Sequence, residues 1–155
     1  MRLIIEAKCF LKDDEHLINK FGLAPGGRAQ RAVDTSSLRY SEKYMPMRSG
    51  SLIKRTYSET VVGSGELVFP GPYAHYLYHG EVYGPSFPIF DDDSGEPTMW
   101  RSRKNIKKHA TGKPLNISTE KNPNATSHWW EVAKANHWKQ ILVEAQKAVR
   151  GSSER

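Results

Sequence analysis

The fold of this chain is decided by YMPMRSGSL at residues 44–52 and ELVFPGPYAHYLYHG at residues 66–80. The residue before a proline avoids helical geometry, so Pro46 predicts the end of a preceding helix, and the Ser-Gly pair that ends at Gly50 predicts a tight turn. In the second part, an apolar strand-like run meets Pro72, which predicts the start of a short tyrosine-rich helix that a glycine closes. The residues expected to set this arrangement are Pro46, Gly50, Leu52, Pro72 and Gly80.

The segments around this stretch predict a small α+β fold. Alternating and β-branched residues indicate strands, whereas apolar residues at helical spacing indicate helices. The expected strands are residues 2–10, 51–58 and 65–69, and the expected helices are residues 15–21, 28–44 and 127–149. Residues 61–64 would form a third strand or a hairpin. We therefore expect a small antiparallel sheet packed by the long helix of the N-terminal half and by the C-terminal helix.

Residues 81–126 differ in composition from the rest of the chain. They are rich in Pro, Gly, Asp, Lys, Asn and Ser, with isolated aromatic residues. A structureless loop of this length is unusual inside a compact domain. The segment is therefore either an arm that orders against a partner, or it holds short strands such as residues 114–117. We expect one domain over residues 1–151, with this arm inserted, and a polar tail at residues 152–155.

The overall composition limits the classes of protein that fit. The chain has 155 residues, of which 37% are apolar and 26% charged, with a formal net charge of +6. The low apolar fraction predicts either a small core or apolar surface supplied by neighbouring subunits. The positive charge permits a polyanionic partner without indicating one. Cys9 is the only cysteine, which excludes an intrachain disulfide and a metal site built from several thiolates.

The N-terminal apolar run, Leu3-Ile4-Ile5, is too short for a signal peptide, and no apolar run approaches the length of a membrane span. We therefore expect synthesis in the cytoplasm and no membrane partner.

The sequence contains no complete catalytic or metal-binding motif. His75 and His79 have the spacing of zinc-binding HExxH helices, but Tyr76 stands where that motif has its glutamate base, and no third ligand is apparent. The acidic run at residues 91–96 lacks the spacing of a calcium loop. No nucleophile elbow, phosphate-binding glycine loop or kinase signature is present. We expect no enzyme activity, metal or cofactor, and a metal-dependent hydrolase is the less favoured alternative.

A basic run is the strongest charge feature of the chain. Its expected contact residues are Arg101, Arg103, Lys104, Lys107, Lys108 and Lys113. Such a run can follow a nucleic-acid backbone without reading its sequence. It can equally remain solvated or pair with acidic residues nearby or on another subunit. The second interpretation is favoured because no stacking aromatic residues interleave with the run.

Aromatic residues are the candidates for an interface. The expected interface residues are Tyr73, Tyr76, Tyr78, Phe87, Phe90, Trp100 and Trp129. The adjacent Trp129 and Trp130 cannot share one face of a helix, so at least one is expected to meet the arm or a neighbouring chain.

Four motifs follow one another in a fixed order. They are PMRSGSL at residues 46–52, PYAHYLYHG at 72–80, GKPLN at 112–116 and WWEVAKAN at 129–136. Together they resemble the minor capsid or neck protein family of tailed bacteriophages. The similarity covers residues 24–149, whereas residues 1–21 and 84–111 depart from the family pattern.

The resemblance implies an α+β subunit that forms a ring, with six copies favoured over twelve, in the head-to-tail connector of a phage particle. Such a subunit joins the DNA-filled head to the tail around the DNA channel. The implied partners are further copies of itself, neighbouring connector and tail-terminator proteins and, non-specifically, the packaged duplex DNA. The implied location is the neck of the virion, after synthesis in the host bacterial cytoplasm. The alternative from another class is a nucleic-acid-binding module that uses the basic residues 101–113.

Overall fold

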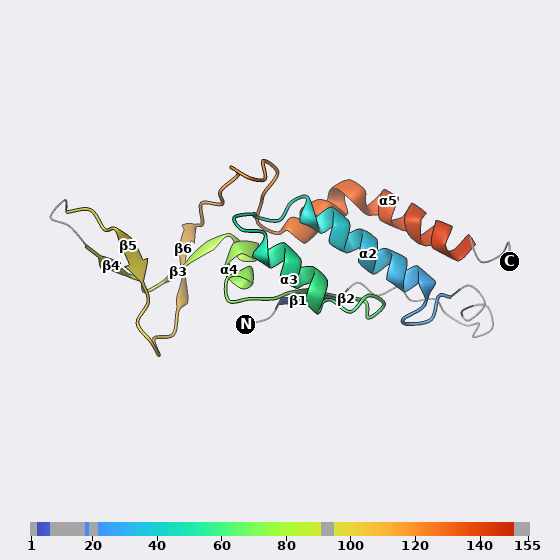
Figure 1. The fold of residues 1–155 in the computed structure, drawn as a ribbon, viewed down its shortest axis with the longest axis horizontal. Coiled ribbons are helices and arrows are strands. Elements are labelled where there is room, and N and C mark those ends of the chain that lie inside the picture. The colour runs from blue at the N-terminus through green and yellow to red at the C-terminus, as the bar shows by residue number, and fades with distance from the viewer. Residues whose placement is uncertain (1–2, 7–17, 19–21, 91–94, 151–155) are drawn as a thin grey trace.

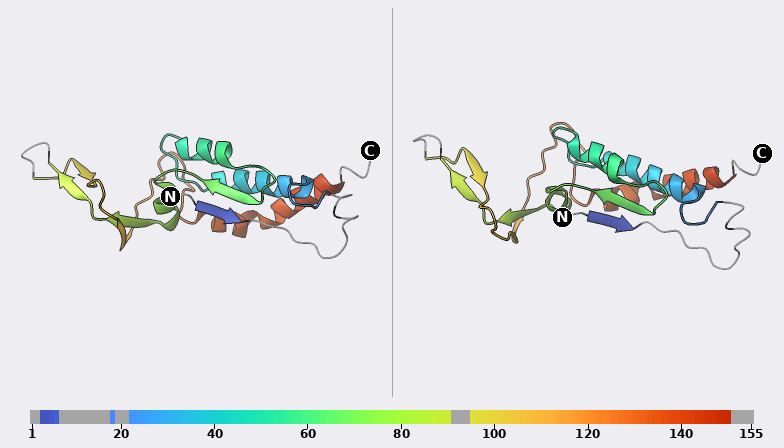
Figure 2. Two further views of the ribbon diagram at one scale, coloured as in Figure 1. Left: turned by 90° about the horizontal axis from the view of Figure 1, so that it is seen from below. Right: turned by 60° about the horizontal axis from the view of Figure 1, so that its bottom comes forward.

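The molecule is an elongated helical body from which a narrow β-arm projects (Figures 1 and 2). The computed structural model describes residues 3–6, 18, 22–90 and 95–150. In chain order its elements are β1 (Leu3–Glu6), α2 (Arg28–Glu42), α3 (Ser51–Glu59), β2 (Glu66–Phe69), α4 (Ala74–His79), β3 (Glu81–Gly84), β4 (Phe87–Ile89), β5 (Met99–Arg101), β6 (His109–Pro114) and α5 (Trp129–Arg150). The expected α+β class is confirmed.

Helices α2 and α5 form one layer of the body, where they lie side by side and run in opposite directions (Figure 1). Helix α2 buries mostly small side chains, including Ala29, Ser37 and Ser41, and this allows close approach of the partner helix. Helix α5 buries Ala133 and Ile141 against the core. The expected helices 28–44 and 127–149 are therefore confirmed.

The second layer is the antiparallel ribbon of β1 and β2. Leu3 pairs with Phe69 and Ile5 with Leu67, and the side chains of Leu67 and Phe69 are fully buried. They belong to one core cluster: Val33, Leu38, Met45, Leu67, Phe69, Ala74, Tyr78, Trp129, Trp130, Ala133 and Ile141. The strand expected at residues 65–69 is confirmed, and that at 2–10 is confirmed over Leu3–Glu6.

Of the other N-terminal expectations, the strand's continuation over residues 7–10 lies outside the described residues, and so does the helix expected at 15–21, apart from Ile18. The tail at residues 152–155 lies outside them as well.

The strand expected at residues 51–58 is wrong, because this segment is helix α3. The β-branched Ile53 and Thr56 favoured a strand in the sequence, but strand alternation would place Lys54 on the same face as Thr56. The helix instead buries Thr56, keeps Leu52 four residues earlier partly buried on the same face, and leaves Lys54 exposed. Residues 61–64 accordingly form the turn from α3 into β2, and not a strand or hairpin.

A buried carboxylate holds that turn. Asp34 of α2 is fully buried, and its Oδ2 accepts hydrogen bonds from the backbone N–H of Gly63 at 2.7 Å and of Gly65 at 3.1 Å. Its Oδ1 accepts a third from the Gln30 side chain at 2.7 Å. One buried side chain thus satisfies two backbone donors of this tight turn.

Both adjacent tryptophans are buried in the core, so the premise that the two cannot both face inward is wrong. Helix α5 begins directly after His128, whose φ of 48° redirects the chain, and the His128 N–H donates to the carbonyl of Tyr78 at 2.8 Å. The first turn of α5 therefore starts beneath α4, where Trp129 meets the rings of Phe69 and Tyr78. Since the start of the helix has neighbours on more than one side, Trp130 also joins the core.

The arm consists of two successive two-stranded ribbons. Strand β3 pairs with β6 next to the body, and β4 pairs with β5 beyond them, both antiparallel. Within the described residues, the strands form three separate two-stranded ribbons and not one sheet. Residues 81–126 thus hold short strands, as one of the two alternatives predicted, although β6 ends at Pro114, where the expected strand 114–117 was to begin.

Candidate interaction surface

An apolar groove of about 700 Å³ lies where the arm joins the body. Its walls are the turn before α3, the loop from β2 into α4, strand β3 and residues 115–118. Apolar side chains along it include Met47, Leu52, Pro72, Leu77, Val82 and Ile117. The groove is large enough for one or two bulky side chains of a partner.

Hydrogen bonds between distant segments fix the walls of the groove. The Asn122 side chain donates to the carbonyls of Lys43 at 3.1 Å and Met45 at 2.8 Å, and the Lys121 ammonium donates to the carbonyl of Arg48 at 2.8 Å. On the opposite side, the Leu115 N–H donates to the carbonyl of Gly80 at 2.7 Å. These bonds hold the turn before α3 and the segment after β6 in one arrangement.

Residues expected to set the fold gather along this groove. Pro46, Gly50, Leu52 and Pro72 line it, and Gly50 has the positive φ of 73° that precedes α3. Gly80 closes α4 with a φ of 66°, and a Cβ there would lie 2.8 Å from the Cβ of Ser127. A side chain at residue 80 would therefore meet both backbone strain and a clash.

The expected interface aromatics divide into outer and inner residues. Tyr73 is 70% exposed and Tyr76 is half-buried, and both line the groove. The Tyr76 ring also lies against Tyr83 of β3, with 4.6 Å between ring centroids. These two tyrosines are available to a partner, and they link the groove to the base of the arm.

The prediction that Tyr78 and Trp129 are interface residues is wrong, because both side chains are buried in the chain's own core. Tyr78 is on the inner side of α4 and donates its hydroxyl hydrogen bond to Glu131 of α5. Burial, followed by that hydrogen bond, raises the pKa of Tyr78 far above its ordinary value. The two residues join α4 to α5 and have no surface to offer a partner.

The β4–β5 hairpin has apolar side chains on both faces. In its register Phe87 lies opposite Arg101, Pro88 opposite Trp100 and Ile89 opposite Met99, so Trp100 and Pro88 share one face. Phe90, Met99 and Trp100 are 53%, 50% and 64% exposed. A two-stranded ribbon has no second layer with which to cover these side chains.

The basic residues lie along the arm. Arg101, Arg103, Lys104, Lys107 and Lys113 are exposed, and Lys108 is half-buried at the edge of the groove. The Arg103 guanidinium lies 4.5 Å from the centroid of the Phe87 ring. The folded chain thus brings an aromatic ring against one residue of the basic run. The run is thus available for an acidic surface or a phosphate backbone.

His75 and His79 lie on the outer side of α4, with ring centroids 4.4 Å apart. Burial, and then the neighbouring His79, lower the pKa of His75, while the Tyr83 hydroxyl lies 3.4 Å from its Nε2. Among the described residues, no group of three or more His, Cys, Asp or Glu side chains is placed to hold a metal ion.

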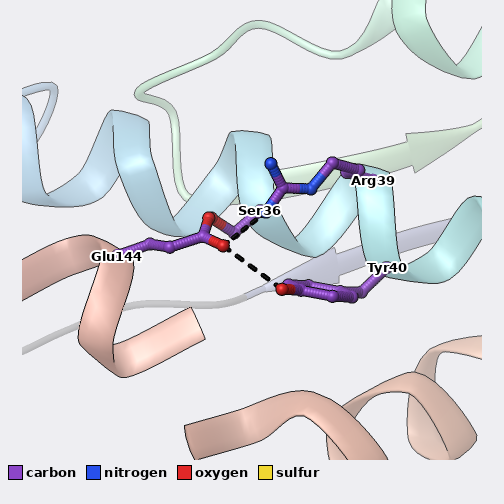
Figure 3. Close-up of polar contacts among 4 residues, drawn as sticks. All are labelled: Ser36, Arg39, Tyr40 and Glu144. Carbon is purple, nitrogen blue, oxygen red and sulfur yellow. Dashed lines mark hydrogen bonds and ion pairs between the residues drawn. The ribbon is translucent and has the colours of Figure 1, made fainter. Parts of the chain in front are cut away.

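A polar cluster at the α2–α5 contact is structural. Figure 3 shows Glu144 of α5 directed at Ser36, Arg39 and Tyr40 of α2. Tyr40 donates to its carboxylate at 3.2 Å. The hydrogen bond from Ser36 lowers the pKa of Glu144, Arg39 acts in the same direction, and burial opposes them. The cluster fixes one helix against the other.

Several residues of the groove could not be found by reading the sequence. Met47, Leu77 and Leu115 lie in three separate segments, and Asn122, whose side chain fixes one wall of the groove, lies in a polar loop. Only the alternation of Leu115 and Ile117 with polar neighbours carried a local signal.

Comparison of the chain with family models, with curated proteins and with solved structures finds no match. Across the described part of the chain, no helix is both long and apolar enough to cross a bilayer.

Proposed function

We propose that the protein is a structural subunit of the head-to-tail connector of a tailed bacteriophage, where it forms a ring of six copies around the DNA channel. The observation that carries the proposal is the arm, whose β4–β5 hairpin leaves Phe90, Met99 and Trp100 at least half exposed among the described residues. An enzyme of this size concentrates its polar groups in a pocket, whereas a ring subunit needs extended contacts with its neighbours. The four motifs at residues 46–136 support the same assignment through their resemblance to the neck family.

In this role the helical body provides the wall of the ring, and the arm provides contacts with neighbouring copies or with the adjoining connector and tail-terminator proteins. The exposed basic residues of the arm would face the packaged DNA or an acidic neighbour. The protein would act after DNA packaging, in the neck of the virion, and would need no metal or cofactor.

The test is the native mass of the purified protein at rising concentration, together with electron microscopy of the assembled fraction. The proposal predicts a closed ring of six subunits with a central opening. A monomer at all concentrations, or a two-fold symmetric dimer that stays at two subunits, would contradict it.

A nucleic-acid-binding module is the second candidate, favoured by the exposure of Arg101, Arg103, Lys104 and Lys107 on one narrow arm. Such a module would bind duplex DNA as a monomer, and its affinity would fall steeply with salt. Salt-dependent binding by a protein that never forms a ring would favour this candidate over the connector subunit.

A further inference from the structure

The net positive charge of the chain is concentrated in the two long helices and not in the arm. Residues 81–126 contain seven basic and six acidic residues, so acidic residues of the same segment nearly match the basic run in number. Residues 28–43 and 129–150, which form α2 with its C-cap and α5, contain eight basic and four acidic residues. The α2–α5 layer therefore carries four of the six net positive charges of the chain.

The four acidic residues of this layer are all engaged within the chain. Asp34 accepts hydrogen bonds from the turn before β2, and Glu144 accepts them from α2. Glu42 and Glu131 each accept one from a tyrosine hydroxyl. The basic side chains of the layer, by contrast, are all exposed: Arg28, Arg31, Arg39, Lys43, Lys134, Lys139, Lys147 and Arg150.

Four of these side chains gather around an open hollow of about 380 Å³ between α2 and α5, and we call them the helical basic cluster: Arg39, Lys43, Lys139 and Lys147. The two lysines of α5 line the hollow beside Tyr40 and Glu144. The Lys43 ammonium and the Arg39 guanidinium lie 4.9 and 5.0 Å from the centroid of the Tyr40 ring. Glu144, the one carboxylate that lines the hollow, pairs with Arg39 (Figure 3). Four cations thus face one carboxylate.

The geometry of the cluster suits a phosphate backbone. Lys139 and Lys147 are eight residues apart, which is about 12 Å along a helix, so they can contact different phosphates of one duplex. Such contacts gain affinity by releasing counterions and need no shaped pocket. The positive potential also acts within the protein, because burial and then Lys43 lower the pKa of His137, whose ring stacks on Tyr40.

We propose that the helical basic cluster binds the phosphate backbone of duplex DNA, and that the α2–α5 layer is the wall of the ring that faces the channel. The inference rests on the proposed connector function and assigns its DNA contact to the body. It leaves the arm for contacts with neighbouring subunits.

Binding of the assembled protein to a short fluorescent DNA duplex of mixed sequence, measured at several salt concentrations, tests this surface. The test variant Lys139→Gln/Lys147→Gln removes two charges from the cluster, and the control Lys104→Gln/Lys107→Gln removes two exposed charges from the arm. The test variant should bind at least about tenfold more weakly, and its salt slope should be smaller by roughly 2, because each phosphate contact contributes about 0.9. The control should stay within about threefold of the unsubstituted protein.

Circular dichroism and native mass check that both variants keep their fold and assembly. If the double variant assembles poorly, Lys147→Gln alone gives the same test, with a slope smaller by roughly 1.

The outcomes separate this inference from the proposed function. An arm control that loses as much affinity as the test variant would overturn the helical contact, and a ring seen by microscopy would still leave the connector role standing. A ring that binds no duplex at low salt would also overturn the inference and would leave the face to an acidic protein. A protein that binds DNA through the cluster but stays monomeric at all concentrations would overturn the connector role and the channel wall.

Discussion

The body and the arm of this protein differ in how far their side chains are buried. In the body, Leu67, Phe69, Trp129 and Ile141 are fully buried by helices and strands of the same chain. In the arm, every residue of β5 and β6 is exposed. Fully burying one large apolar side chain stabilises the folded state by about 1.5–3 kcal/mol. The core of the body gains this stabilisation, whereas the exposed side chains of the arm do not. The difference is that the core of the body is buried within the chain, whereas the arm leaves Phe90, Met99 and Trp100 exposed, as the proposed contact with neighbouring subunits would require.

The largest effect on stability is expected for Trp129→Ala in the core of the body. The side chain is fully buried between Phe69 and Tyr78, so its removal leaves a cavity and should lower the free energy of unfolding by about 3–5 kcal/mol. Chemical denaturation of the monomer measures the change. A loss below about 1 kcal/mol would show that Trp129 does not belong to the core as described.

The next largest effect is expected for Asp34→Asn. The substitution keeps the size of the side chain but replaces one acceptor oxygen with an NH₂ group, which can face the N–H donors of Gly63 and Gly65. Unfolding should become easier by about 2–3 kcal/mol because buried donors lose their acceptor. The matched control is the exposed Glu120. Glu120→Gln is expected to change stability by less than about 0.5 kcal/mol.

A smaller loss is expected for Gly80→Ala at the junction of body and arm. The positive φ of Gly80 disfavours a side chain, and the new Cβ would contact Ser127. Together these effects should cost about 1–2 kcal/mol in thermal or chemical unfolding. Adding Ser127→Gly removes the clash but not the strain, so it should recover part of the loss. A fully stable Gly80→Ala variant would contradict the geometry described for this junction.

Glu144→Gln should cost about 1 kcal/mol at neutral pH, because the charge-assisted hydrogen bonds from Ser36 and Arg39 weaken. The pKa of Glu144 in the folded chain is below its ordinary value of 4.5. Its stabilisation is therefore fully present above that pH and is lost as the pH falls through the folded pKa. Unfolding of both proteins across acidic pH should show the difference shrinking towards zero. A difference that grows on acidification would contradict the assigned contacts.

The smallest effect on stability is expected for Trp100→Ala in the arm. The side chain is mostly exposed, so the free energy of unfolding of the monomer should change by less than about 0.5 kcal/mol. Assembly should nevertheless need at least about tenfold more protein, because an interface anchor is lost. Trp138→Ala on the outer side of α5 is the matched control, since it removes a partly exposed tryptophan outside the arm and groove. Equal assembly by the two variants would contradict the role of the arm.

The sequence predicted the parts of the body whose signals are local. The spacing of apolar residues indicated α2 and α5, and proline and glycine marked the start and end of α4. Helix α3 was missed because its β-branched residues favour a strand, although the spacing of Leu52 and Thr56 suits a helix. In that segment, burial on one helical face outweighed the intrinsic preference of the residues.

The candidate site was only partly predictable. The exposure of Phe90 and Trp100 agrees with the surface role expected for the isolated aromatic residues of segment 81–126, and Tyr73 of the tyrosine-rich segment is exposed as well. The burial of Tyr78 and Trp129 depends on α5 starting beneath α4, a contact between segments that are 53 residues apart at Tyr78 and Glu131. The groove likewise combines four separate segments, and no short pattern in a sequence reports such a juxtaposition.

The central claim is that the arm acquires its cover from a neighbouring copy. Hydrogen exchange of the backbone amides of β4 and β5, compared between diluted monomer and assembled protein, tests it most directly. We predict rapid exchange in the monomer and protection of at least about tenfold on assembly, while the amides in the middle of α2 stay protected in both states. Equal exchange of β4 and β5 in monomer and assembly would contradict the claim.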